Sequence, residues 1–170
     1  MTGLKAKVRD ELLAFDGRAI SILSQAIARH HDEPEFLDVI ISLSADPEDY
    51  LADGATWIIK DHLDKGGVLT ASQTNKFVSQ AIKTESWAAN LHVCQSVQHL
   101  SVSEKAAKEL APWLGILLEH KRPFLRAWSM DALSAIAKAH PEYEKKAKAA
   151  IKAGLEDSAA SVRARAKNLS

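Results

Sequence analysis

Residues 110–137, LAPWLGILLEHKRPFLRAWSMDALSAIA, decide the fold that we predict for this chain. In the first half the leucines recur at helical spacing, and Pro112 suits the first turn of a helix, where no N–H is needed. In the second half one helical face carries a stripe of apolar and small residues, Leu125, Ser129, Ala132, Leu133 and Ile136. A charged turn at residues 121–123 joins the halves, so the two helices should lie antiparallel, and neither can bury its stripe alone.

This stretch resembles the HEAT repeat, a helical hairpin that stacks into α-solenoids. The resemblance lies in the order Leu-x-Pro-x-Leu-x-x-Leu-Leu, a charged turn, and then Leu-Arg-x-x-Ser-x-x-Ala-Leu-x-x-Ile. Residues 155–166 are similar, with an acidic turn at Asp157 and with Val162 and Arg163 opening the second helix. In that family, turn carboxylates and arginines at helix starts commonly pair and link neighbouring repeats. The resemblance therefore implies such a structural role for Arg126 and Arg163.

Weaker copies of the hairpin recur along the whole chain. The aligned stripes of the second helices open at Ala19, Leu51, Trp87, Leu125 and Val162, which are 32, 36, 38 and 37 residues apart. These periods suit a helical-hairpin repeat, and the tetratricopeptide pattern of small and aromatic positions is not visible. We therefore predict an all-α chain that forms a single domain over residues 1–170. The resemblance implies a right-handed, HEAT-like α-solenoid of about five antiparallel helical hairpins, an α-α superhelix with approximate repeats 2–31, 32–66, 67–100, 101–139 and 140–170.

Capping and turn residues predict several helix boundaries. One helix should begin with Asp32 as its cap, Pro34 in its first turn and Glu35 in a capping-box arrangement. A second proline start is expected at Pro47, and Thr84 is a plausible cap for a later helix. Glycine turns are expected at Asp16-Gly17 and Gly66-Gly67.

The composition is that of one folded unit. With 170 residues, 46% of them hydrophobic and 26% charged, the chain can bury a sizeable core. No apolar run approaches the roughly 20 residues needed to span a bilayer, and the charged N-terminus does not suit a signal peptide. We therefore expect a soluble cytoplasmic protein without a membrane partner. Cys94 is the only cysteine, which excludes an internal disulfide, and its place on a helical stripe predicts a buried side chain.

The sequence contains no recognisable catalytic or metal-binding motif. Its seven histidines include no His-Glu-x-x-His and no pair four residues apart, which would place two imidazoles on one helical face. Four of them fall at predicted helix C-termini, where imidazole interacts favourably with the helix dipole, namely His30, His62, His120 and His140. We predict no catalytic residue, no metal and no cofactor, and we favour a protein that is not an enzyme.

The tryptophans and the charges indicate where a partner could bind. Trp128 lies off the Leu125 stripe and near Asp131, so among the tryptophans it has the best case for a binding hot spot. The other three, Trp57, Trp87 and Trp113, are expected to pack between hairpins. Residues 1–64 hold 6 basic and 13 acidic side chains, a net charge of −7, whereas residues 121–170 hold 11 and 5, a net charge of +6. In a linear array this difference becomes a dipole, although ordinary scatter of solvated charges explains it equally well.

A solenoid usually ends in a capping repeat with a polar outer face, and we expect no such repeat at the C-terminal end of this array. The short last helix, about residues 161–170, carries a stripe at Val162, Ala166 and Leu169 that only the preceding hairpins can cover. We therefore expect this basic end to be prone to association. It should bind an acidic partner, or the acidic N-terminal end of a second copy, with an affinity that falls as salt rises.

Three functions from different classes remain open. The first is a non-catalytic scaffold or adaptor that binds a protein or peptide partner, an acidic one if the basic end is used, and that self-associates weakly. The second is nucleic-acid binding, because DNA-alkylation-repair glycosylases have a similar helical-repeat build and use Trp and Asp in a basic groove. The third, an accessory subunit of a bilin-lyase-type enzyme, rests on fold analogy alone. We favour the scaffold, with the candidate binding residues Arg126, Trp128, Asp131, Lys145, Lys146, Arg163 and Arg165.

Overall fold

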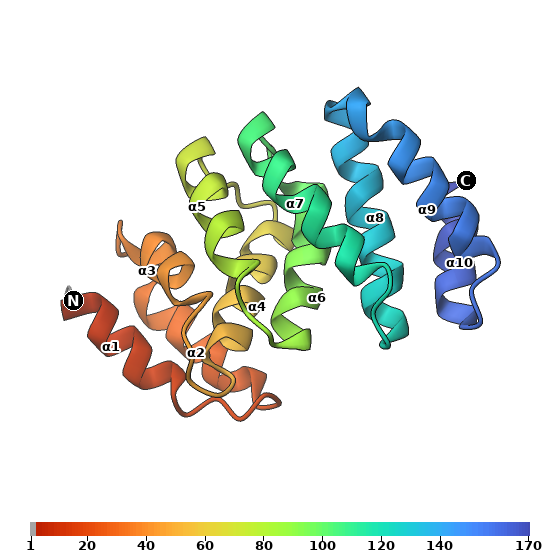
Figure 1. Cartoon of the computed structure of the whole chain (residues 1–170). Coiled ribbons are helices and arrows are strands. Elements are labelled where there is room, and N and C mark those ends of the chain that lie inside the picture. The colour runs from red at the N-terminus through yellow and green to blue at the C-terminus, as the bar shows by residue number, and fades with distance from the viewer. Residues whose placement is uncertain (1–2) are drawn as a thin grey trace.

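The computed structural model describes residues 3–170, and over these residues the chain is all-helical, as predicted (Figure 1). The described chain contains no strand. Its α-helices are α1 (Gly3–Leu12), α2 (Ile20–His30), α3 (Phe36–Leu43), α4 (Leu51–Asp64), α5 (Ala71–Ala81), α6 (Trp87–Ser96), α7 (Glu104–Leu117), α8 (Pro123–Ala139), α9 (Glu144–Leu155) and α10 (Ala160–Leu169). Two short 3-10 helices are η1 (Val97–His99) and η2 (Pro141–Tyr143). Within residues 3–170, every helix is too short or too polar to pass through a membrane.

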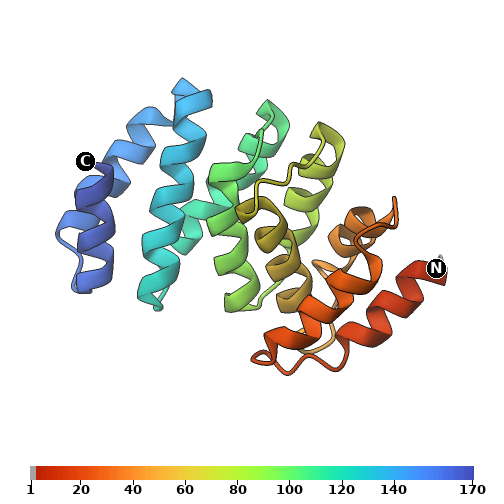
Figure 2. The same ribbon diagram turned by 180° about the vertical axis from the view of Figure 1, so that it is seen from behind.

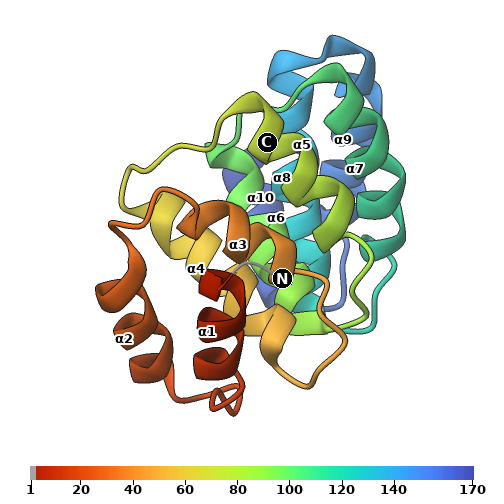
Figure 3. The same ribbon diagram turned by 90° about the vertical axis from the view of Figure 1, so that its left-hand side faces the viewer.

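Alternate helices pack beside one another in two rows. α4, α6, α8 and α10 pack in succession and form one row, which is nearest the viewer in Figure 2. α3, α5 and α7 pack in succession and form the other row, which is in front in Figure 1. Figure 3 looks along this array from its N-terminal end. The two chain ends lie at opposite ends of the array, so the acidic first third and the basic last third are separated in space.

Apolar side chains fill the space between the rows. One large cluster of buried residues lies among α1 to α6, and a second lies among α5 to α9. The half-buried side chains of Leu100 and Trp113 pack against both clusters and connect them. Leu133 is fully buried, and so is Cys94, as the helical stripes predict.

The apolar stripe at the C-terminal end is covered, which corrects the prediction that this end is sticky. Val162 and Ala166 are buried in a third, smaller cluster with Met130, and Leu169 packs against that cluster. The cause is the close packing of α10 on both α8 and α9. Gly154 permits this approach, since a Cβ atom there would lie only 2.7 Å from the Sδ of Met130. The apolar stripe of α10 is therefore not available as a binding surface.

Two of the proline-marked helix starts are wrong. α3 begins at Phe36 without a side-chain cap, and Asp32, Pro34 and Glu35 precede it in the turn. α4 begins at Leu51 rather than at Pro47.

The segment from Pro47 to Tyr50 does not belong to α4, because Tyr50 has a left-handed φ of 61°, which interrupts a right-handed helix. Asp46 accepts hydrogen bonds from the Arg9 guanidinium of α1, at 3.0 and 3.1 Å, and from the backbone N–H of Glu48, so it links α1 to the turn before α4.

Two helices are capped by serines rather than starting at the predicted residues, Thr84 for α6 and Pro112 for α7. α6 is capped by Ser86, whose Oγ accepts from the Ala89 N–H, while Thr84 Oγ1 accepts from the Ser86 N–H one turn earlier. α7 is capped by Ser103, and Pro112 lies inside this helix rather than in its first turn. Pro112 is exposed, so water can reach the carbonyl that the missing N–H leaves unpaired.

Both predicted glycine turns are present. Gly17 has a φ of 81° and Gly66 a φ of 86°, a left-handed conformation that glycine adopts without steric cost. Asp16 Oδ1 accepts from the N–H groups of Arg18 and Ala19, at 2.9 and 2.8 Å, and closes the first of these turns.

Candidate functional site

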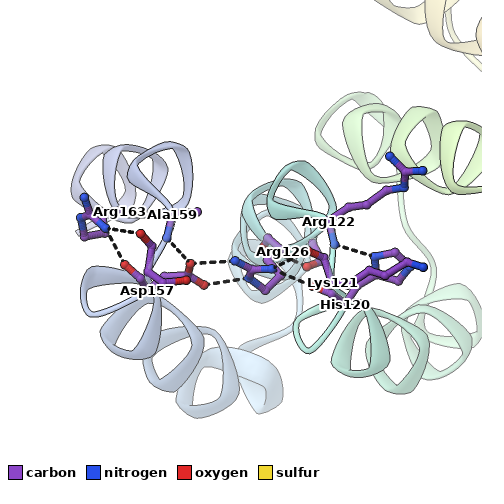
Figure 4. Close-up of polar contacts among 9 residues, drawn as sticks. His120, Lys121, Arg122, Arg126, Asp157, Ala159 and Arg163 are labelled. Carbon is purple, nitrogen blue, oxygen red and sulfur yellow. Dashed lines mark hydrogen bonds and ion pairs between the residues drawn. The ribbon is translucent and has the colours of Figure 1, made fainter.

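Arg126 connects two consecutive turns at one edge of the array (Figure 4). Its Nε and Nη2 donate to the two carboxylate oxygens of Asp157, each at 2.8 Å, and form a bidentate ion pair. Its Nη1 donates to the carbonyls of His120 and Lys121, at 2.8 and 3.2 Å. The guanidinium thus joins the turn between α7 and α8 to the turn between α9 and α10. The predicted pairing of Arg126 with a turn carboxylate is present.

The ion pair is held rigidly on both sides. Asp157 Oδ1 also accepts from the Ala159 N–H at 2.8 Å, which positions the carboxylate just before α10. Hydrogen bonding to Arg126 lowers the pKa of Asp157, and the same bond raises the pKa of Arg126. Both side chains are largely withdrawn from solvent, with 17% and 16% of their surfaces exposed. The guanidinium of Arg126 therefore uses its hydrogen-bond donors within the protein, so Arg126 is a structural residue rather than a free ligand for an anion.

Arg163 occupies the position in α10 that Arg126 occupies in α8, four residues after the helix cap. Its Nη1 donates to the carbonyls of Asp157 and Ser158, at 2.7 and 2.9 Å, which repeats the carbonyl contacts of Arg126. Within residues 3–170 Arg163 forms no ion pair with a carboxylate, so its contacts stay within the turn before its own helix. These two carbonyl contacts agree with the structural role that the resemblance implies.

Three of the predicted binding residues meet between α8 and α10. Arg165 Nη1 donates to Asp131 Oδ2 at 3.0 Å, and the Arg165 guanidinium carbon lies 3.9 Å from the centroid of the Trp128 ring. This distance is that of a cation–π contact. Trp128 is half-buried, and 31% of the Arg165 side chain is exposed against 13% of the Asp131 side chain. We call these three residues the Trp128 cluster.

The two predicted lysines belong to a different helix from the Trp128 cluster. Lys146, on α9, donates from Nζ to the Ala111 carbonyl of α7 at 3.1 Å. Lys145 is exposed, and its ammonium bonds to no group in the described chain. The structure therefore divides the seven candidates among four places. Arg126 forms the ion pair with Asp157, which we call the turn ion pair, and Arg163 bonds to the carbonyls of the turn before α10. The other five belong to the Trp128 cluster and to the surface of α9.

A similar contact, which was not predicted from the sequence, lies between α4 and α6. Thr56 Oγ1 lies 3.0 Å from His92 Nδ1. Thr56, His92, Trp128 and Arg165 each stand six residues after the cap of their helix, at intervals of 36, 36 and 37 residues. That spacing is visible in the sequence, but the four side chains share no chemistry that would draw attention to it. Side chains at this one position connect α4 to α6 and α8 to α10.

Burial dominates the electrostatics of the pair between α4 and α6. It lowers the pKa of His92 to about 4, with a smaller contribution from the positive charge of Lys60. Thr56 Oγ1 also donates to the Ala52 carbonyl at 2.8 Å, which leaves a lone pair of this oxygen to accept a hydrogen bond from the Nδ1–H of His92. The imidazole is therefore neutral at pH 7.

The other tryptophans differ from one another in exposure. Trp57 and Trp113 are half-buried and pack against the core, as predicted. Trp87 is 43% exposed, and the guanidinium carbon of Arg122 lies 4.2 Å from its ring centroid. Trp87 belongs to none of the buried clusters of the described chain, so it does not pack in the core between hairpins as predicted; its ring lies instead against Arg122, the residue before α8, at the surface.

Residues 3–170 contain no group of three or more His, Cys, Asp or Glu side chains arranged to hold a metal ion. No family model matches the sequence, and no curated protein matches it. The Trp128 cluster and the turn ion pair are therefore the features from which a function can be derived.

Proposed function

We propose that the chain is a HEAT-like α-solenoid of about five antiparallel hairpins that works as a non-catalytic interaction scaffold. The row of α4, α6, α8 and α10 supports this proposal, since it presents a continuous surface built from segments about 36 residues apart. Extended surfaces of this kind are what helical-repeat proteins use to bind other chains. The bidentate contact of Arg126 with Asp157 supports it further, as a link between neighbouring repeats.

The Trp128 cluster is the observation that carries the proposal. Trp and Arg are enriched among the residues that dominate binding energy at protein interfaces. Here Asp131 and the indole ring hold the guanidinium in one place, so little side-chain freedom remains to be lost on binding. Arg165 still has donors to offer, because its Nε and Nη2 bond to no group within residues 3–170. We propose an acidic protein or peptide partner, whose carboxylate would meet these donors.

The experiment compares what wild-type protein and three variants retain from a lysate of the native cell. Trp128→Ala and Arg165→Gln alter the cluster, and Ile116→Ala is the control, because Ile116 is 70% exposed on α7 in the other row. We expect one protein to be retained stoichiometrically by wild type and by Ile116→Ala and to be lost with both cluster variants. Identical retention by all four proteins, or retention by none, would contradict the proposal.

A nucleic-acid ligand is the second candidate. It is favoured because Trp128 and Asp131 both contact Arg165 and therefore lie close together. The resemblance to repair glycosylases rests on a Trp and an Asp in a basic groove, and the structure brings such a pair together. Two observations weigh against it. Asp131 is engaged by Arg165 rather than free to act as a base, and the net charge of −7 over residues 1–64 interrupts any continuous phosphate-binding track.

We therefore expect only weak binding to duplex DNA, with an affinity that falls steeply as salt rises, because few phosphates could be neutralised. Fluorescence anisotropy with a labelled duplex at several salt concentrations measures this. An incubation with alkylated duplex DNA, for wild type and Asp131→Asn, tests for catalysis. Tight binding at about 0.15 M salt, or base excision that Asp131→Asn abolishes, would reverse the order of the two candidates.

A further inference from the structure

The row that contains α3, α5 and α7 is interrupted before α9. α9 packs on α8 and α10, and Figure 1 shows α8 in view between α7 and α9. A hollow of 640 Å³ opens there, between the turn that ends α7 and the turn that ends α9. Its volume lies in the range of small-ligand pockets, which is roughly 300–1,000 Å³. We call this opening the α7/α9 hollow.

The floor of the α7/α9 hollow is apolar. It is made of side chains from the turn after α7 and from α8, α9 and α10 that are buried or half-buried, among them Leu118, Met130, Ala150 and Val162. Such a floor gains free energy when an apolar side chain replaces water on it.

The rim of the hollow is positively charged. Lys121 stands in the turn after α7, and its ammonium bonds to no group among residues 3–170. Lys146 reaches across from α9 to the Ala111 carbonyl and would lie 3.4 Å from a Cβ atom at Gly115, so its ammonium is held against α7. Two carboxylates also line the hollow, and the one of Asp157 is neutralised by Arg126 (Figure 4). The two lysines thus face only Glu119 as an unpaired negative charge.

We propose that the α7/α9 hollow binds a short acidic and apolar segment of a partner protein. One or two apolar side chains of that segment lie on the floor, and an adjacent Asp or Glu carboxylate lies against Lys121 and Lys146. Charge complementarity selects the carboxylate, and the volume admits a few side chains rather than a whole helix. A nucleic-acid backbone fits less well, because the floor is apolar and Arg126, the best phosphate ligand in the hollow, is already bound by Asp157. This surface is separate from the Trp128 cluster, so it goes beyond the function proposed above.

The test begins with a phage-displayed library of random hexapeptides selected on the full-length protein at low salt. We expect the enriched sequences to combine a large apolar residue with a neighbouring Asp or Glu. A fluorescein-labelled peptide of the enriched sequence then serves as the probe in anisotropy titrations. The double variant Lys121→Glu, Lys146→Glu should weaken its binding about tenfold or more, since two exposed charge contacts become repulsive. The matched double variant Lys138→Glu, Lys167→Glu changes the net charge equally at exposed sites outside the hollow and should bind like wild type within about twofold.

A steric variant tests the floor without a change of charge. Ala153 is exposed and lines the hollow, so Ala153→Trp should fill it and abolish binding of the probe, whereas Ala164→Trp, at an exposed position of α10 outside the hollow, should not. Trp128→Ala should leave the affinity for the probe unchanged, so failure of this inference and failure of the proposed function are distinguishable. The inference is overturned if no sequence is enriched, if the enriched sequences lack acidic residues, or if binding survives the lysine and Ala153 variants. Displacement of the probe by duplex DNA at low micromolar concentration would also overturn it, in favour of a general polyanion site.

Discussion

Replacing Leu133 with alanine is expected to lower the free energy of unfolding by about 2–5 kcal/mol, the usual range for a buried leucine. Leu133 has 0% exposed surface and stands in the middle of α8, the helix that packs against α6, α7, α9 and α10. The truncation leaves a cavity in the cluster that Leu133 shares with residues of α5, α6, α7 and α9, and helices held on several sides relax little. Urea denaturation followed by circular dichroism measures the change.

The control for this prediction is Ile116→Ala, because Ile116 is 70% exposed on α7. Its effect should stay within about 0.5 kcal/mol, as is usual for surface substitutions. A denaturation midpoint that Leu133→Ala leaves unchanged would show that the stripe of α8 is not the face that supports the core.

Acidification from pH 7 to pH 4 is expected to reduce stability by about 3 kcal/mol through His92 alone, since a shift of one pKa unit corresponds to about 1.4 kcal/mol. Burial lowers the pKa of His92 from 6.5 to about 4 in the folded protein. Between these two values the unfolded chain binds a proton at this position and the folded chain does not, so stability rises with pH. The contribution is fully present above pH 6.5 and is lost as the pH falls towards 4.

The variant His92→Gln isolates this effect, because glutamine can still bond to the Thr56 hydroxyl but takes up no proton. Urea denaturation of both proteins at pH 7 and at pH 4.5 gives the comparison, in which the contributions of the carboxylates are common to both. We expect the variant to lose less stability on acidification than wild type. Equal losses would mean that His92 is hydrated and titrates in the folded protein as it does in the unfolded chain.

The candidate site could be predicted only in part from the sequence. The resemblance to the HEAT repeat implied that Arg126 pairs with a turn carboxylate, and the structure shows this pair with Asp157. The contact of Arg165 with Asp131 could not be predicted in the same way. It depends on how far α10 lies from α8 and on which rotamer fits beside the Trp128 ring, and both follow from packing.

Helix boundaries show the same division. The turns predicted at Gly17 and Gly66 are confirmed. Each glycine has a positive φ, a local backbone conformation that glycine adopts readily whatever the rest of the chain does. The helix starts predicted at Pro112 and Pro47 are wrong, because proline is also tolerated inside an exposed helix and in the turn ahead of one. At Pro47 the left-handed φ of 61° at Tyr50 separates the turn from α4.

The sequence by itself determined the helical class, the inward faces of the helices and the separation of negative from positive charge, because side-chain periodicity and chain order act within one segment or along one array. Only the tertiary structure decided that Trp87 is exposed, that Val162 is covered, and that a hollow opens between α7 and α9. Each of these depends on distances between helices more than thirty residues apart in the chain. Those distances are set by the close packing of all the side chains between them, which no local pattern contains.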